Sequence, residues 1–207
     1  YGMGTGDTVM VGYNAGKRTV GSANVGIGYG ALYGASATAA NNTGTSNTAV
    51  GQNALRWMSK TIGSTAIGAE AGYYTTGSAN TFVGYYAGRG GTTSAPYSSG
   101  TGNVAVGYQA LDAFTTGNQN VAIGREAGTA MTTPERNVVI GGYAGYAITT
   151  GGSNTAIGDN AGAAATTASG SVFLGRLAGG TVTTGNDNIA IGNDAMNGAT
   201  TTGDNNI

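Results

Sequence analysis

A nine-residue motif recurs along this chain, and its recurrence limits the fold more than any other feature. In its commonest form it reads N-x-A-[IV]-G-x-x-A-G, as in NTAIGDNAG beginning at Asn154. A unit this short cannot bury its own apolar face, so the sequence predicts a stacked repeat array. The central glycine of the motif occurs at eleven positions: Gly12, Gly28, Gly51, Gly68, Gly84, Gly107, Gly124, Gly141, Gly158, Gly175 and Gly192.

The spacing of these glycines divides the array into two parts. From Gly12 to Gly107 the intervals are 16, 23, 17, 16 and 23 residues, and from Gly107 onward every interval is 17 residues. We call residues 1–106 the irregular part and residues 107–207 the regular part. The extra length of the 23-residue coils falls in 32–45 and 89–102, and insertions of this kind become loops where recognition is common. We expect one repeat array of eleven coils, taken from a longer chain because a twelfth motif opens at Asn206.

Two aliphatic columns precede the glycine and predict a short β-strand. β-Branched residues stand three positions before it, and aliphatic residues such as Ile123, Ile140 and Ile157 stand one position before it. Columns two residues apart share one side of an extended strand, and β-branched residues favour that conformation. We therefore predict that both columns face inward. The residues between them, mostly Ala but Phe82, Val139 and Phe173 in three coils, would point away and suit a contact between subunits.

The remaining columns predict turns and a thin coil. The central glycine allows a turn or a close backbone approach, and the alanine three residues after it implies that two backbone layers lie close together. A Thr-Thr pair, usually followed by Gly or Pro, marks a second turn. Asparagine opens most repeats and predicts an amide ladder or a turn cap between coils. These asparagines are Asn24, Asn47, Asn80, Asn103, Asn120, Asn137, Asn154 and Asn188.

Together these columns predict an all-β parallel solenoid of about 17-residue coils, in which each strand pairs with its equivalent in the next repeat. A lone roll rich in Ala and Gly buries little apolar area, which favours packing of several rolls around an axis. We expect a homotrimer on this ground.

Composition narrows the function. The chain has no cysteine and no histidine, which removes thiol chemistry, the usual general base and the commonest transition-metal ligand. A net charge of −1 gives no electrostatic reason to expect nucleic acid or an anionic membrane as a partner. No apolar run has the length of a membrane span. We predict no catalytic residues, no metal and no cofactor.

The acidic residues do not change that prediction. Asp187, Asp194 and Asp204 do not recur at the nonapeptide spacing of calcium-binding β-rolls, and we interpret them as polar turn residues. Glu70 and Glu126 share a column but belong to coils three apart, about 14 Å by the strand spacing, which is too far for a paired-carboxylate hydrolase.

The repeats NVAIGREAG, NTAIGDNAG and NTAVGQNAL resemble those of two groups of fibrous proteins. One is the head domain of trimeric autotransporter adhesins, which implies a left-handed parallel β-roll in a homotrimer. The other is the set of phage and bacterial tail-fibre proteins in which such repeats alternate with T-T-G-x-x-N; the 17-residue return fits this second group better. The resemblance implies an extended extracellular attachment fibre, on a virion tail or a bacterial surface.

Aromatic residues concentrate in the irregular part and suggest a binding strip. Tyr13, Tyr29, Tyr85 and Tyr108 share the position just after the glycine, and such side chains give contact area at little entropic cost. They can stack on sugar rings, or they can cover a sparse surface or pack between subunits. The candidate binding residues are Tyr33, Trp57, Tyr73, Tyr74, Tyr85, Tyr86, Pro96, Tyr97 and Tyr108.

The prediction for function is therefore a non-enzymatic attachment fibre that contacts a host-surface glycan or protein through its irregular part. A self-assembling filament without a receptor of its own is one alternative, and end-to-end continuation of the array is compatible with both. An ice-binding solenoid is a weaker alternative, because the threonines of each Thr-Thr pair are adjacent and diverge.

Overall fold

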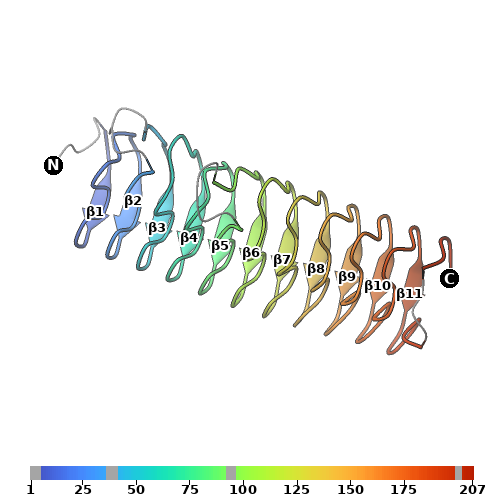
Figure 1. Cartoon of the computed structure of the whole chain (residues 1–207). Helices are drawn as coiled ribbons and strands as arrows, with labels where there is room; N and C mark the ends of the chain where they lie inside the picture. Colours follow the sequence, from blue (N-terminus) through green and yellow to red (C-terminus); the bar gives the residue numbers. More distant parts are fainter. Residues whose placement is uncertain (1–5, 36–41, 92–96, 199–201) are drawn as a thin grey trace.

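The computed structural model describes residues 6–35, 42–91, 97–198 and 202–207, and this part of the chain folds into a parallel β-solenoid without helices. The coils follow one another in chain order along a single extended axis (Figure 1). Each coil contributes one three-residue strand to an eleven-stranded sheet. The strands are β1 Val9–Val11, β2 Val25–Ile27, β3 Thr48–Val50, β4 Thr65–Ile67, β5 Thr81–Val83, β6 Val104–Val106, β7 Val121–Ile123, β8 Val138–Ile140, β9 Thr155–Ile157, β10 Val172–Leu174 and β11 Ile189–Ile191.

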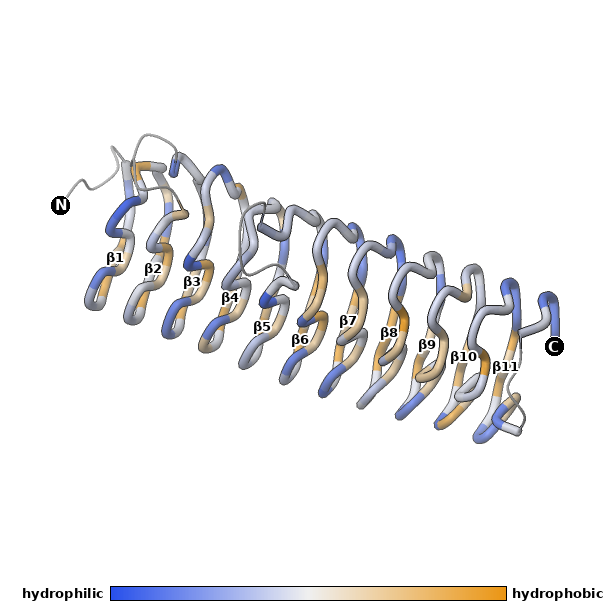
Figure 2. The backbone as a smooth tube through the Cα atoms, in the orientation of Figure 1, coloured by the Kyte–Doolittle hydropathy of each residue, from blue (hydrophilic) through white to orange (hydrophobic). Residues whose placement is uncertain are grey.

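The register of the sheet follows the sequence repeat. In β7 and β8 the pairs are Val121↔Val138, Ala122↔Val139 and Ile123↔Ile140, and every neighbouring pair aligns the same columns. Hydrophobic residues line the strands while hydrophilic residues gather at the turns (Figure 2). The predicted fold class, strand positions and coil length are confirmed.

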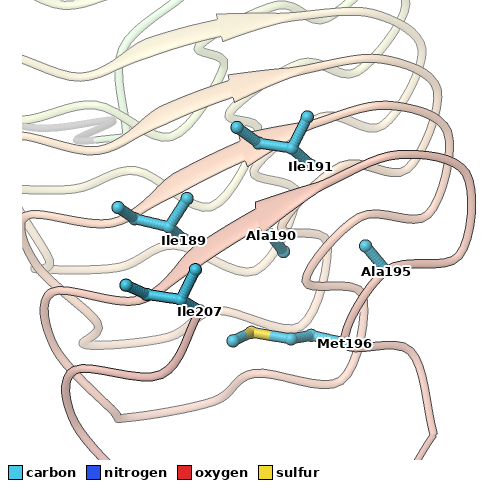
Figure 3. Close-up of a pocket in the computed structure, with 6 residues that line it drawn as sticks. All are labelled: Ile189, Ala190, Ile191, Ala195, Met196 and Ile207. Atoms are coloured by element: carbon cyan, nitrogen blue, oxygen red, sulfur yellow. The ribbon is translucent and has the colours of Figure 1, made fainter.

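The predicted direction of the strand faces is wrong. In every strand from β2 to β11 the middle residue is buried, and the flanking aliphatic residues are half-buried or exposed; in β4, Ala66 is 0% exposed and Ile67 is 43% exposed. Figure 3 shows the alternation in the last coil, where Ala190 points toward Ala195 and Met196 while Ile189 and Ile191 lie on the other side of the strand. The columns that contain Ile123, Ile140 and Ile157 therefore face outward.

The middle column belongs to the core, and this corrects its assignment to a subunit contact. Phe82, Val139 and Phe173 are fully buried. The alanines three residues after the glycine are also buried in most coils, as the thin coil requires. The core thus combines the small alanines of these two columns with larger side chains from the rest of the coil, such as Phe114, Met131 and Ile148, while the residues that flank the middle strand position lie outside it.

In several coils the core is filled by a complementary pair of residues. The partner of the middle strand residue stands four positions after the glycine. Where the middle residue is Ala49 or Ala105, that partner is Leu55 or Leu111, all of them buried. Where the middle residue is Phe173, the partner is Gly179, whose added Cβ would lie 2.1 Å from the phenylalanine ring. In these coils a large residue at one position accompanies a small residue at the other. In the coils of β4, β7 and β9 both positions are small, and Phe82, Met131 and Phe173 lie against Gly72, Gly128 and Gly162 instead.

The central glycines are required by both conformation and contact. Gly124 has φ 136°, and a Cβ there would lie 2.4 Å from the carbonyl oxygen of Gly141 in the next coil. The equivalent glycines of the regular part, Gly107, Gly141, Gly158 and Gly175, also have positive φ and meet the carbonyl of the following central glycine. Any side chain in this column would push the coils apart.

The asparagine ladder is confirmed, and it connects coils in two ways. Asn120 Oδ1 accepts hydrogen bonds from the backbone N–H of Asn137 at 3.0 Å and from its Nδ2 at 3.1 Å. Asn137 Nδ2 also donates to the carbonyl oxygen of Gly151 at 3.0 Å, which closes the return turn of its own coil. Ser171 replaces asparagine in one coil and keeps the ladder, because its Oγ accepts from the backbone N–H of Asn188 at 3.1 Å. Buried amides are thereby satisfied throughout the ladder.

The threonine returns form a second ladder. The hydroxyl of Thr132 donates to the carbonyl oxygen of Thr149 at 3.1 Å. The hydroxyl of Thr149 donates in turn to the carbonyl oxygen of Thr166 at 3.2 Å. The second threonine of each pair, such as Thr133 or Thr150, is exposed. Only one hydroxyl of each pair is therefore available to solvent.

Candidate interaction surfaces

The first candidate surface is the outward aliphatic face, formed by the residues one and three positions before each central glycine. It runs the length of the eleven-stranded sheet. Ile27 and Leu174 are 39% and 43% exposed although neighbouring strands flank both of them. In β7 to β9 the members are half-buried, because aligned Val, Ile and Thr side chains about 4.8 Å apart in adjacent coils cover one another. A continuous apolar face of this kind is unusual for a lone soluble chain.

The second candidate surface contains the tyrosines that directly follow the glycine. Tyr13 and Tyr29 stack with ring centroids 5.5 Å apart, and Tyr85 and Tyr108 stack at 5.8 Å. Gln52 and Ala69 occupy the same position in the two coils between these pairs, as the sequence numbering from the glycine shows. The expected strip is therefore two separate stacked pairs.

A third surface joins most of the other candidate residues. Five positions after the glycine, the first five coils carry Lys17, Tyr33, Arg56, Tyr73 and Arg89 in succession. We call these residues the cation–aromatic column. Backbone hydrogen bonds place them in register: Arg18 N donates to Tyr33 O at 2.9 Å, Gly34 N to Arg56 O at 2.9 Å, and Tyr74 N to Arg89 O at 2.8 Å.

The cations of this column stack on its rings. The guanidinium of Arg56 lies 4.6 Å from the ring centroid of Tyr33, and that of Arg18 lies 4.9 Å from the same centroid. The Lys17 ammonium is 5.9 Å from it. Because Tyr33 belongs to the coil between those of Arg18 and Arg56, cations flank this ring along the array axis. Each such contact contributes about 0.5–1 kcal/mol at an exposed site.

The other aromatic candidates extend the column. Tyr97, from the second long coil, stacks on Trp57 at 5.5 Å and on Tyr74 at 6.1 Å. Arg89 lies over Tyr86 at 4.5 Å and over Tyr74 at 5.6 Å. These rings stack on one another or on guanidinium groups, so their faces are largely occupied. This geometry disfavours the stacking of sugar rings that the sequence suggested.

The structure thus gathers Tyr33, Trp57, Tyr73, Tyr74, Tyr86 and Tyr97 around one column and places Tyr85 and Tyr108 beside it, while Pro96 lies outside the described residues. Sequence reasoning missed Arg18, Arg56 and Arg89. Their signal is present only when all coils are aligned on the glycine and compared five and six positions after it, beyond the motif itself.

Titratable groups near the column have shifted pKa values. A hydrogen bond with Tyr85 raises the pKa of Tyr86 to about 12, and desolvation acts in the same direction. Burial raises the pKa of Tyr74. Burial also raises the pKa of Asp112, against the opposing effect of Arg89. The Oδ1 atom of Asp112 is buried without a hydrogen-bond partner, so this carboxylate is poorly solvated.

The remaining acidic residues make ordinary surface contacts. Asp204 accepts a hydrogen bond from the backbone N–H of Asn186 at 2.6 Å, and Asp194 lies 3.9 Å from Arg176. Within the described ranges, no group of three or more acidic side chains is placed to hold a metal ion. The same ranges contain no helix that is long and apolar enough to cross a membrane.

Comparisons of the chain with protein-family models, with curated proteins and with solved structures found no match. The fold and its surfaces therefore carry the functional argument.

Proposed function

We propose that this chain forms the rigid shaft of an extracellular attachment fibre, in which three copies pack through their outward aliphatic faces. The observation that carries the proposal is the face itself. Each strand of the sheet contributes two residues to this face, all of them Val, Ile, Leu or Thr, and none of its positions is charged. An apolar surface that repeats with the coil matches a partner with the same repeat, and a second copy of this chain has that repeat.

The trimer rests on a different surface from the one that the sequence suggested. The middle strand column is core, so the subunit contact moves to the columns on either side of it. Three rolls around one axis bury such a face on every copy, which supports three-fold closure. A fibre of eleven coils at about 4.8 Å per coil extends roughly 50 Å.

Attachment is assigned to the irregular part. It holds both long coils, the cation–aromatic column and most of the tyrosines, whereas the regular part repeats one pattern. Uniform coils supply reach and rigidity, and recognition requires surface variation. The fibre is proposed to be non-enzymatic, with no cofactor, and to contact a cell-surface glycan or protein.

The ice-binding alternative is not favoured by the return turns. One hydroxyl of each Thr-Thr pair already donates to the next coil, as Thr115 does to Thr132 O at 3.0 Å. Only one row of threonine hydroxyls therefore faces solvent, whereas a T-x-T face presents two rows. A thermal-hysteresis measurement that detects activity would revive this alternative.

The test of the trimer compares two triple variants in the same stretch of coils. Ile123, Ile140 and Ile157, all on the outward aliphatic face, are changed to Asn in one variant. Thr133, Thr150 and Thr167, which are exposed on the return turns, are changed to Asn in the other. Native mass spectrometry is expected to find a trimer for the parent chain and the Thr variant. The Ile variant is expected to be a folded monomer. A folded monomer for the parent chain would overturn the proposal.

A further inference from the structure

The cluster around Tyr33 carries an inference about the ligand of the proposed fibre, and it rests on that proposed function. The irregular part has five basic residues against two acidic residues, and the regular part has three against seven. The excess of basic residues in the irregular part and the excess of acidic residues in the regular part nearly cancel, so the net charge of the chain does not reveal them. None of the residues outside the described ranges has a charged side chain, so the structure describes the surroundings of every Lys, Arg, Asp and Glu.

The two parts also differ in how their cations are paired. In the regular part, Arg125, Arg136 and Arg176 each lie within 4.0 Å of a carboxylate. In the irregular part only Arg89 does, at 3.3 Å from Glu70. Lys17, Arg18 and Arg56 make no ion pair within the described residues, although all three lie around one ring.

Grouping three unpaired cations costs electrostatic free energy, and an anionic ligand would remove that cost. The guanidinium groups are held in place by stacking. A guanidinium that stacks by its face keeps its in-plane N–H donors available for a carboxylate. The Arg56 side chain is further fixed by donating from Nη1 to Asn53 Oδ1 at 2.8 Å. Its Nε is buried without a hydrogen-bond partner, so the Nη groups are the donors of Arg56 that a carboxylate can reach.

The spacing of the cations indicates a linear ligand. In the cation–aromatic column Lys17, Arg56 and Arg89 alternate with tyrosines, so cations recur every two coils, or about every 9.6 Å. A linear acidic polysaccharide with one carboxylate per disaccharide presents charges at a comparable interval. Nucleic acid fits less well, because the ring faces on which bases would stack are largely occupied by guanidinium groups and other rings.

We propose that Lys17, Arg18, Arg56 and Arg89 form an extended site for a linear carboxylated polysaccharide that lies along the array axis. The tyrosines of the column act as positioning residues, because the guanidinium groups stack on their rings. The site lies on the turns of the coils, whereas the proposed subunit contact is on the sheet.

The experiment measures binding of the full chain to immobilised hyaluronate, with dextran as a neutral polymer and oligo(dT) as a single-stranded nucleic acid. The test variant is Arg18→Gln with Arg56→Gln, and the matched control is Arg125→Gln with Arg176→Gln. Loss of two charge-assisted contacts is expected to weaken hyaluronate binding at least about tenfold, with the control within about twofold of the parent chain. Binding is expected to weaken at high salt.

Equal binding to dextran, stronger binding to oligo(dT), or an equal loss in the control variant would each overturn the inference. Circular dichroism and native mass spectrometry of the same samples separate it from the proposed function. A trimer that does not bind hyaluronate would be consistent with the proposed fibre and would refute the proposed polysaccharide site. A monomer that binds hyaluronate through Arg18 and Arg56 would support the polysaccharide site and would refute the proposed trimer.

Discussion

The irregular and regular parts of this solenoid share one core and differ almost entirely at their surface. Both use the same glycine, alanine and asparagine columns, and strands β1 to β11 pair without interruption. The irregular part carries alternating cations and tyrosines at the turns. The corresponding positions of the regular part hold no cation; they are Asp112, Thr129, Tyr146, Ala163, Gly180 and Asn197. The core of a solenoid thus leaves its turns free to vary, because each coil is closed by its own columns.

The largest expected effect tests the core that the two parts share. Replacing Val139 by Asp buries a charge beside Gly128 and Gly145, where the coil has no room for water, and should destabilise the chain by at least about 4 kcal/mol. Replacing its neighbour Ile140 by Asp places the charge on the outward aliphatic face. That variant is expected to keep its fold and lose self-association. The two are compared by thermal unfolding and native mass spectrometry, and equal unfolding of both would contradict the face assignment.

The next effect tests whether the complementary core pair works in both parts. Phe82→Ala in the irregular part and Phe173→Ala in the regular part should each cost about 3–5 kcal/mol. Adding Gly179→Leu to Phe173→Ala recreates the Ala and Leu pair found in other coils, and Leu55 and Leu111 already adopt positive φ at that position. Denaturant unfolding is expected to show partial recovery in the double variant. A double variant less stable than Phe173→Ala alone would refute the complementarity.

A smaller effect concerns the asparagine ladder. Asn137→Ala leaves the backbone N–H of Asn154 and the carbonyl of Gly151 without their side-chain partner, which should cost about 1–3 kcal/mol. Asn137→Ser is the control, because Ser171 keeps the N–H acceptor at the same column. It is expected to cost less than the alanine variant. If both substitutions shifted the unfolding midpoint equally, the hydroxyl would not be replacing the amide.

The strand positions, the coil length and the asparagine ladder were predictable because each depends on register alone. A period of two, however, separates a strand into two faces without saying which is inside. The usual preference for larger aliphatic residues in a core favoured Ile67 over Ala66, and the thin coil reverses it. Residue size alone could not have identified the inward column, because its buried members range from Ala66 to Phe82 and Phe173.

The candidate site was predictable only in its location. Aromatic residues marked the irregular part, but insertions of unequal length hide the alternation of Lys17, Tyr33 and Arg56 in the linear sequence. Stacking of side chains from successive coils follows from the strand spacing, and it gives ring faces that point along the array axis. The expectation of free faces for sugars overlooked this geometry.

The smallest expected effect lies where the two parts meet. Asp112 follows Arg89 in the same column, and burial raises its pKa above the ordinary value of 3.8. The protonated form is thus favoured in the folded state, so its contribution to stability is present below pH 3.8 and is lost as the pH rises through the raised value. Asp112→Asn removes the buried charge and should stabilise the chain at neutral pH by no more than about 1 kcal/mol, because solvent screens this partly exposed site.

The pH dependence of that variant distinguishes charge from packing. Chemical unfolding of the parent chain and of Asp112→Asn is expected to show a gap at pH 7 that closes as the pH falls below 3.8, where both side chains are neutral. The control is Asp159→Asn, an exposed acid in the regular part, which should give no gap at either pH. A gap that persisted in acid would assign the effect to the amide's hydrogen bonds. If Asp112→Asn were instead less stable than the parent chain at neutral pH, attraction between Asp112 and Arg89 would outweigh the cost of burial. Asp112 would then be an ionic partner of the cation–aromatic column.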